Sequence, residues 1–183
     1  MATLLENVQK YLRKRKIKKI RGNKKRVLKL RELDEVKTVG IVFDASSEDL
    51  YKRSAHLVRH FASLRKEVKS ISITNTDIIP AYADDTLSFN YILKKDINWY
   101  GLPNNKYVED FINTEFDILI NLDLKESSSL SFIVNTSMAN LKIGINNNSE
   151  DIELDFMLEG IKDNDLSIFM KELLRYLEMI KTK

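Results

Sequence analysis

Two short apolar runs, each ending in an aspartate, constrain the fold of this 183-residue chain more than any other feature. Residues 38–44 read Thr-Val-Gly-Ile-Val-Phe-Asp, and residues 116–123 read Phe-Asp-Ile-Leu-Ile-Asn-Leu-Asp. Such a run is typical of a strand that is buried on both faces of a parallel sheet. Helical apolar periodicity follows the first run over residues 50–64, and residues 68–74 then alternate as a second strand. The pattern therefore predicts a β-α-β unit, and its crossover is expected to be right-handed.

The rest of the chain continues the alternation of strands and helices. Further strands are predicted at 141–145 and, as an edge strand, at 154–158. Residues 87–93 could form either a strand or a turn of helix. Apolar periodicity also predicts three helices, around 107–112, over 127–138 and over 166–180. We expect an α/β three-layer sandwich with a mainly parallel sheet of about five strands, flavodoxin- or Rossmann-like, in the order 2-1-3-4-5.

A basic N-terminal arm is expected over residues 1–37, before a Rossmann-like domain at 38–183. Residues 1–38 hold 14 Lys and Arg against 4 Asp and Glu, a net charge of about +10, whereas the remaining residues hold 16 against 23. Residues 3–20 predict a helix, because Thr3 and Glu6 match the capping-box pattern. Residues 27–33 mix apolar and basic side chains and could form a strand or a second short helix.

A dense cationic segment of this kind most often binds polyanions, with RNA first among them. The segment has no ordered pattern for reading bases, so contacts to phosphates are expected. Trp99 could add a platform for a stacked base, although a lone Trp more often covers a sheet edge. The sequence thus predicts a non-enzymatic RNA- or ribosome-associated protein whose acidic body faces solvent or a protein partner. The residues expected to contact nucleic acid are Lys10, Arg13, Lys14, Arg15, Lys16, Lys18, Lys19, Arg21, Lys24, Lys25 and Arg26.

The arm is open to two other interpretations. An apolar stripe beside its basic residues suits the surface of an anionic membrane, and consists of Leu4, Leu5, Val8 and Leu12. The arm could also dock on its own acidic body, which would weaken the case for RNA. The pattern of residues leaves both interpretations open.

An alternative hypothesis places a small-molecule or enzymatic site at the carboxyl ends of strands 38–44 and 116–122. Ligands of open α/β sheets bind at such ends, where the strand order reverses. Paired carboxylates and exposed N–H groups could hold a cation or a small ligand there, but the same residue types commonly cap helices. The residues of this possible ligand crevice are Asp44, Ser46, Ser47, Asp123, Ser127 and Ser128.

Several kinds of chemistry are disfavoured by what the sequence lacks. The absence of cysteine excludes disulfides and thiolate metal sites. No G-x-G-x-x-G follows the first strand and no Walker-type motif is present, so no nucleotide cofactor is expected. His56 and His60 lie four residues apart on a helix beside Arg59, and no metal is expected there. No apolar run is long enough to span a bilayer and no secretory signal is found, so we expect a cytoplasmic protein.

Several motifs resemble an uncharacterised conserved family of Bacteroidota proteins. They read Thr-Val-Gly-Ile-Val-Phe-Asp-Ala at 38–45, Asn-Trp-Tyr-Gly-Leu-Pro at 98–103, Phe-Ile at 111–112, Phe-Asp-Ile-Leu-Ile-Asn-Leu-Asp-Leu at 116–124 and Ala-Asn-Leu-Lys-Ile-Gly at 139–144. The resemblance covers roughly residues 38–180. It implies a small cytoplasmic α/β protein of unknown role, with no catalytic residues to carry over. Residues 116–144 are also similar to part of the heptosyltransferase-type glycosyltransferase domain, but without a second domain transferase activity is not expected.

Overall fold

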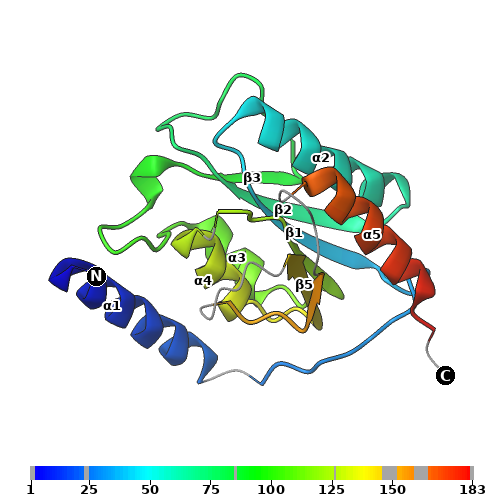
Figure 1. The fold of residues 1–183 in the computed structure, drawn as a ribbon, viewed down its shortest axis with the longest axis horizontal. Coiled ribbons are helices and arrows are strands. Elements are labelled where there is room, and N and C mark those ends of the chain that lie inside the picture. Colours follow the sequence, from blue (N-terminus) through cyan, green and yellow to red (C-terminus); the bar gives the residue numbers. More distant parts are fainter. Residues whose placement is uncertain are drawn as a thin grey trace.

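Six parallel strands form one sheet in the part of the chain that the computed structural model describes (Figure 1). The described residues are 3–22, 25–84, 86–125, 127–145, 152–158 and 165–181. The strands are β1 (Thr38–Asp44), β2 (Glu67–Ile73), β3 (Phe89–Ile92), β4 (Ile118–Asn121), β5 (Leu141–Ile145) and β6 (Phe156–Leu158). They lie in the order β3-β2-β1-β4-β5-β6, and each neighbouring pair is parallel. The predicted α/β sandwich with a mainly parallel sheet is confirmed.

The order expected for five strands is also found, and β3 extends it at one edge. Residues 87–93, whose structure the pattern left undecided, contain this strand, in which Phe89 pairs with Ser70 of β2. β1 and β4 are neighbours, because Val39 pairs with Ile118 and Val42 with Asn121. The strand order therefore reverses between β1 and β4, as the sequence predicted.

Helices cover both faces of the sheet. α2 (Glu48–Ser63) and α5 (Leu166–Met179) lie on one face, and α3 (Lys106–Asn113) and α4 (Ser128–Thr136) lie on the other (Figure 1). A short 3₁₀ helix, η1 (Lys94–Asp96), follows β3. Side chains cap three of these helices: Ser47 accepts a hydrogen bond from Leu50 N, Asn105 accepts one from Tyr107 N, and Asp165 accepts one from Ser167 N.

Alternate residues of the central strand fill the two apolar layers. Ile41 and Phe43 belong to the core beneath α2 and α5, whereas Val42 belongs to the core beneath α3 and α4, and all three are fully buried. Gly40 permits a close approach, because a Cβ atom at this position would lie 2.8 Å from the ring of Phe116. The apolar run that predicted this strand is thus explained by burial on both faces.

α1 (Leu4–Arg21) precedes the sheet and lies beside α4, on the outer side of that layer (Figure 1). The predicted capping box is present: Glu6 N donates to Thr3 Oγ1 at 3.2 Å, and Thr3 N donates to Glu6 Oε2 at 2.6 Å. The helix ends at Gly22, whose N–H donates to Lys18 O at 2.8 Å.

The connection from α1 to β1 forms neither the strand nor the short helix that its sequence suggested. Residues 27–33 form no strand and no helix, so both predictions are wrong; residues 25–32 are irregular and 33–35 form a turn. Individual hydrogen bonds, rather than the ladder of a β-sheet, join this segment to the body. One of them runs from Lys29 N to Asn140 O at 3.3 Å. Val27, Leu28 and Leu30 point outward and are exposed, which explains why their mixed pattern has no regular period.

Asp117 fastens the end of this connection to the sheet. Its Oδ2 accepts hydrogen bonds from Lys37 N at 2.8 Å and from Thr38 N at 3.1 Å, and its Oδ1 lies 2.8 Å from Arg31 Nε. Burial raises the pKa of Asp117, but the hydrogen bonds from Lys37 and Thr38 and the charge of Arg31 outweigh it, so the pKa lies below its ordinary value. The ionised carboxylate therefore stabilises the folded chain.

Asp117→Asn should lower the free energy of unfolding at pH 7 by about 2 kcal/mol, because it weakens the buried acceptor and removes the partner of Arg31. A depressed carboxyl pKa stabilises above the unfolded value and ceases to do so as the pH falls through the folded value. The difference in free energy of unfolding between wild type and Asp117→Asn, measured by urea denaturation, should therefore become smaller below about pH 4. Asp110→Asn, at an exposed position of α3, is the matched control and should have little effect. An equal loss of free energy of unfolding in Asp117→Asn and Asp110→Asn would contradict this role of Asp117.

Candidate anion-binding site

One face of α1 docks on the body. Gln9 Nε2 donates to Trp99 O at 2.8 Å, and Arg13 Nη1 donates to Tyr100 O at 3.1 Å. One and two turns further on, Ile17 and Ile20 pack against the apolar core that lies under α3 and α4. Spacings of three and four residues place these side chains on one side of the helix. The basic helix is therefore part of the folded molecule.

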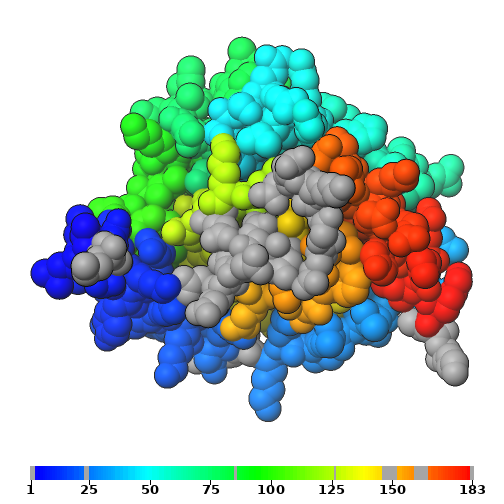
Figure 2. All heavy atoms as spheres, in the orientation of Figure 1, coloured from blue at the N-terminus to red at the C-terminus, as the bar shows by residue number. Residues whose placement is uncertain are grey.

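The outer side of α1 carries a dense set of cations. Figure 2 shows the atoms of α1, in dark blue, lying against the rest of the molecule with their outer side open to solvent. The exposed basic residues of this helix are Lys10, Lys14, Arg15, Lys16, Lys18, Lys19 and Arg21. Arg15, Lys16 and Lys19, which we call the outer cations, form no ion pair within the described part of the chain. Their charge is not compensated locally and is available to a polyanion.

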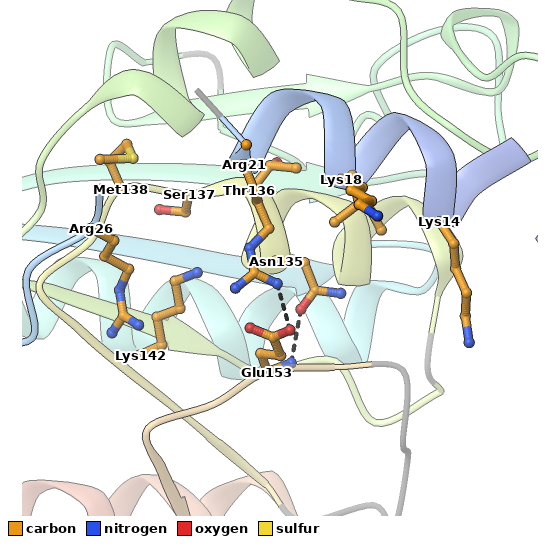
Figure 3. Close-up of a pocket in the computed structure, with 12 residues that line it drawn as sticks. Lys14, Lys18, Arg21, Arg26, Asn135, Thr136, Ser137, Met138, Lys142 and Glu153 are labelled. Atoms are coloured by element: carbon orange, nitrogen blue, oxygen red, sulfur yellow. Dashed lines mark hydrogen bonds and ion pairs between the residues drawn. The ribbon is translucent and has the colours of Figure 1, made fainter. Parts of the chain in front are cut away.

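A cavity of about 710 Å³ opens beside the C-terminal half of α1 (Figure 3). α1, the connection after it, the end of α4, the start of β5 and residue 153 form its walls. Five basic side chains line this cationic pocket: Lys14, Lys18, Arg21, Arg26 and Lys142. The remaining lining residues are Ile17, Gly22, Asn135, Thr136, Ser137, Met138 and Glu153. A second hollow of about 410 Å³, lined by Lys16, Lys19 and residues of α3, lies next to the same helix.

Lys142 is the most buried cation of the pocket, at 3% exposure. Its neighbours Leu141 and Ile143 belong to the core under α2 and α5, so the alternation of β5 turns Lys142 toward the layer of α4 and α1. Burial, followed by the charges of Arg26 and Arg21, lowers the pKa of Lys142 to about 8, although Asp155 and Glu153 act in the opposite direction. This ammonium group is therefore held in surroundings that disfavour its charge.

Two carboxylates near the pocket are engaged by arginines. Arg21 forms an ion pair with Glu153, and Glu153 N donates to Asn135 Oδ1 at 2.8 Å (Figure 3). Arg26 forms an ion pair with Asp155 and also donates to Ala139 O at 2.6 Å. These contacts hold Arg21 and Arg26 in place on two sides of the cavity.

The structure thus brings together part of the predicted nucleic-acid-binding set. Lys14, Lys18, Arg21 and Arg26 line the pocket, while Lys16 and Lys19 line the second hollow. Lys10, Arg15 and Lys25 are exposed outside both, and Arg13 is used to dock α1. Lys24 lies outside the described residues.

Lys142 and the polar residues at the end of α4 were not predicted from the sequence. One signal was present: a lysine interrupts the otherwise apolar run Leu-Lys-Ile-Gly-Ile of residues 141–145. A charged residue in a buried strand is costly unless it has a partner, so it marks a position to explain.

The possible ligand crevice at the carboxyl ends of β1 and β4 is held together by contacts within the protein. Lys125 Nζ lies 2.9 Å from Asp44 Oδ2, and Lys125 N donates to Asp123 Oδ1 at 3.0 Å. Asp44 also accepts from Ser46 N at 2.7 Å, and Asp123 accepts from Ser127 N at 2.6 Å. Burial raises the pKa of Asp44, but hydrogen bonds from Ser46 and Lys125 outweigh it and leave the pKa below its ordinary value.

The serines of this crevice have local roles. Ser46 Oγ accepts from Lys125 Nζ at 3.3 Å, and Ser47 caps α2. Ser127 is the N-cap residue of α4 without a side-chain cap bond, and Ser128 lies beside Gly101. Of these serines, Ser47 alone caps a helix with its side chain, and a ligand at this edge stays a prediction.

A family model described as "Family of unknown function (DUF6913)" matches residues 8–180. The chain belongs to this family. The match begins inside α1 and crosses the boundary predicted at residue 37, so it includes most of the basic segment. No curated protein and no solved structure matches this DUF6913 chain.

None of the described helices combines the length and apolar character needed to cross a membrane. Among the described residues, no group of three or more His, Asp and Glu is arranged to hold a metal ion.

Lys142→Met should raise the free energy of unfolding at pH 7 by about 3 kcal/mol, because a pKa lowered from 10.5 to about 8 measures the cost of burying the charge. The unfolded lysine binds more protons than the folded one between these values, so wild-type stability recovers as the pH rises. The difference in free energy of unfolding between Lys142→Met and wild type should therefore become smaller as the pH rises from about 8 to about 10.5. Denaturant unfolding across this range measures it, and a destabilised variant would contradict the assignment.

Proposed function

We propose that the protein binds RNA, free or in the ribosome, through its phosphate backbone and without catalysing a reaction. The observation that carries the proposal is the set of cations held on the outer side of α1 by docking of the opposite side. Because the helix is already fixed, its cations need not be ordered when a polyanion binds. We also propose that this takes place in the cytoplasm, and the Bacteroidota distribution of the family stays a prediction.

The dimensions of α1 suit a nucleic-acid strand. Lys10 and Lys19 are separated by about 14 Å along the axis at 1.5 Å per residue. For comparison, one strand of B-DNA presents about four phosphates over that length, at about 3.4 Å each. Trp99 adds an aromatic side chain that is 61% exposed beside the docked end of α1, where a base could stack.

The alternative of a small-molecule or enzymatic site at Asp44 and Asp123 has weaker support. Lys125 and the following backbone N–H groups engage both carboxylates, so a ligand there would have to displace internal hydrogen bonds. The outer cations require no such displacement.

An anionic membrane surface is a second candidate partner, and one observation favours it. Leu4, Leu5, Val8 and Tyr11 remain exposed at the start of α1, whereas Leu12 of the predicted stripe is half-buried. Exposed apolar side chains beside cations are the combination that inserts into a lipid interface. The patch covers only the first two turns of α1, so we rank it below RNA.

Replacing the outer cations with glutamine (Arg15→Gln, Lys16→Gln and Lys19→Gln together) should weaken RNA binding and its dependence on salt. Loss of three phosphate contacts should reduce the slope of log affinity against log salt by about 2 for a single strand. Binding of a short single-stranded RNA and of ribosomal RNA is measured between about 50 and 200 mM salt. This design is preferable to deleting residues 1–37, because Ile17, Arg26 and Arg31 contact the body.

The matched control removes three exposed lysines elsewhere, by Lys94→Gln, Lys95→Gln and Lys106→Gln. It should leave the affinity and the salt slope close to those of wild type. An unchanged slope in the α1 variant, or an equal change in the control, would rule out the proposal. Phosphatidylserine vesicles form a second arm, and binding to vesicles without binding to RNA would favour the membrane surface instead.

A further inference from the structure

We infer that the cationic pocket beside α1 is a binding site for a phosphate monoester, with Lys142 as its innermost donor. This inference goes beyond RNA-backbone binding by the outer cations, because none of those three residues lines the pocket. The ligand could be the terminal phosphate of an RNA or a small phosphorylated molecule, and both present the same phosphoryl group.

The first argument is the position of the Lys142 ammonium group. The residue is 97% buried, and its Nζ has no hydrogen bond or ion pair with any residue that the structure describes. Figure 3 shows the side chain extending from β5 between the side chains of Arg26 and Arg21. Burial of this side chain disfavours its charged form, and an anion in the pocket would offset that cost.

The second argument is the balance of charge around the cavity. Five basic side chains line it, and the two nearby carboxylates, Glu153 and Asp155, are paired with Arg21 and Arg26 rather than with Lys142. The C-terminal ends of α1 and α4 add about half a negative charge each. The basic side chains outweigh these contributions, so the pocket retains a net positive charge that a phosphate dianion would neutralise.

The third argument is the size and polarity of the pocket. A volume of about 710 Å³ is far more than one phosphoryl group needs and lies within the range of small-molecule sites. Ser137 is buried at the pocket wall, and its Oγ accepts from Ala139 N at 3.2 Å, which leaves the hydroxyl proton for an anionic oxygen. Arg21 contributes a planar guanidinium group whose Nη1 contacts Glu153, and such a group can bind two phosphate oxygens at once.

Phosphate binding at this site should be linked to protonation of Lys142. The lysine loses its proton at a lower pH than usual in the free protein, and an anion beside it would restore the charged form. Above about pH 8, binding should therefore take up a proton and become weaker as the pH rises. A purely structural lysine would show no such linkage.

The test is titration calorimetry of the full chain with inorganic phosphate, ribose 5-phosphate, and matched 5′-phosphorylated and 5′-hydroxyl RNA oligonucleotides. Lys142→Met should lower the affinity for the phosphate-bearing probes at least tenfold without lowering the melting temperature. Lys142→Met should also abolish the proton uptake that accompanies phosphate binding to wild type at pH 8.5. This uptake is measured by comparing the heat of binding in buffers of different ionisation enthalpy. Lys69→Met, which removes a partly exposed lysine from β2, should change neither property.

The outcomes separate the source of the phosphate from the existence of the site. Tighter binding of 5′-phosphorylated than 5′-hydroxyl RNA would support an RNA end, and binding of ribose 5-phosphate alone would support a small molecule. Failure of wild type to bind any phosphate monoester, or equal binding by Lys142→Met, would overturn the inference. The variant that lacks the outer cations should lose RNA binding but still bind phosphate monoesters. Each of the two proposals can therefore be refuted without refuting the other.

Discussion

Arg26 makes the contacts on which the arrangement of the basic segment depends. Its guanidinium donates to Ala139 O and Asn140 O and pairs with Asp155. Asp155 in turn accepts from Lys142 N at 2.8 Å, so one arginine joins the connection after α1 to both β5 and the chain just before β6. Charge-assisted hydrogen bonds of this kind are stronger than neutral ones and hold a segment that has no ladder of its own.

Docking changes what the cations of α1 can do. An unattached basic tail would repel itself and adopt many conformations, so binding a polyanion would first require it to become ordered. Here Arg13, Ile17 and Ile20 are used to hold the helix, and the remaining cations divide between the outer side and the pocket. The same helix therefore offers a surface for an extended polyanion and one wall of the cationic pocket.

Local patterns predicted most of the fold because the central strands β1, β4 and β5 are buried on both faces, and helices such as α2 and α5 have a broad apolar face. The runs at 38–44 and 116–123, and the capping box at Thr3, needed no knowledge of distant contacts. Residues 27–33 could not be predicted in this way, since Lys29 and Arg31 bond to Asn140 and Asp117, which are far away in the sequence. The apolar side chains of this segment point largely to solvent. The pocket was missed for the same reason: α1, α4 and β5 meet only through tertiary structure, and Lys142 shows its significance only after they do.

Amide hydrogen exchange across α1 in the full chain tests the central claim most directly, namely that the basic helix is docked on the body. The backbone amides of Ile17–Arg21 should exchange much more slowly in the full chain than in a synthetic peptide of residues 3–22, because isolated helices of this length are only marginally stable in water. Equal exchange rates in the protein and the peptide would mean that α1 is not held by the body, and would contradict both the pocket and the fixed set of outer cations.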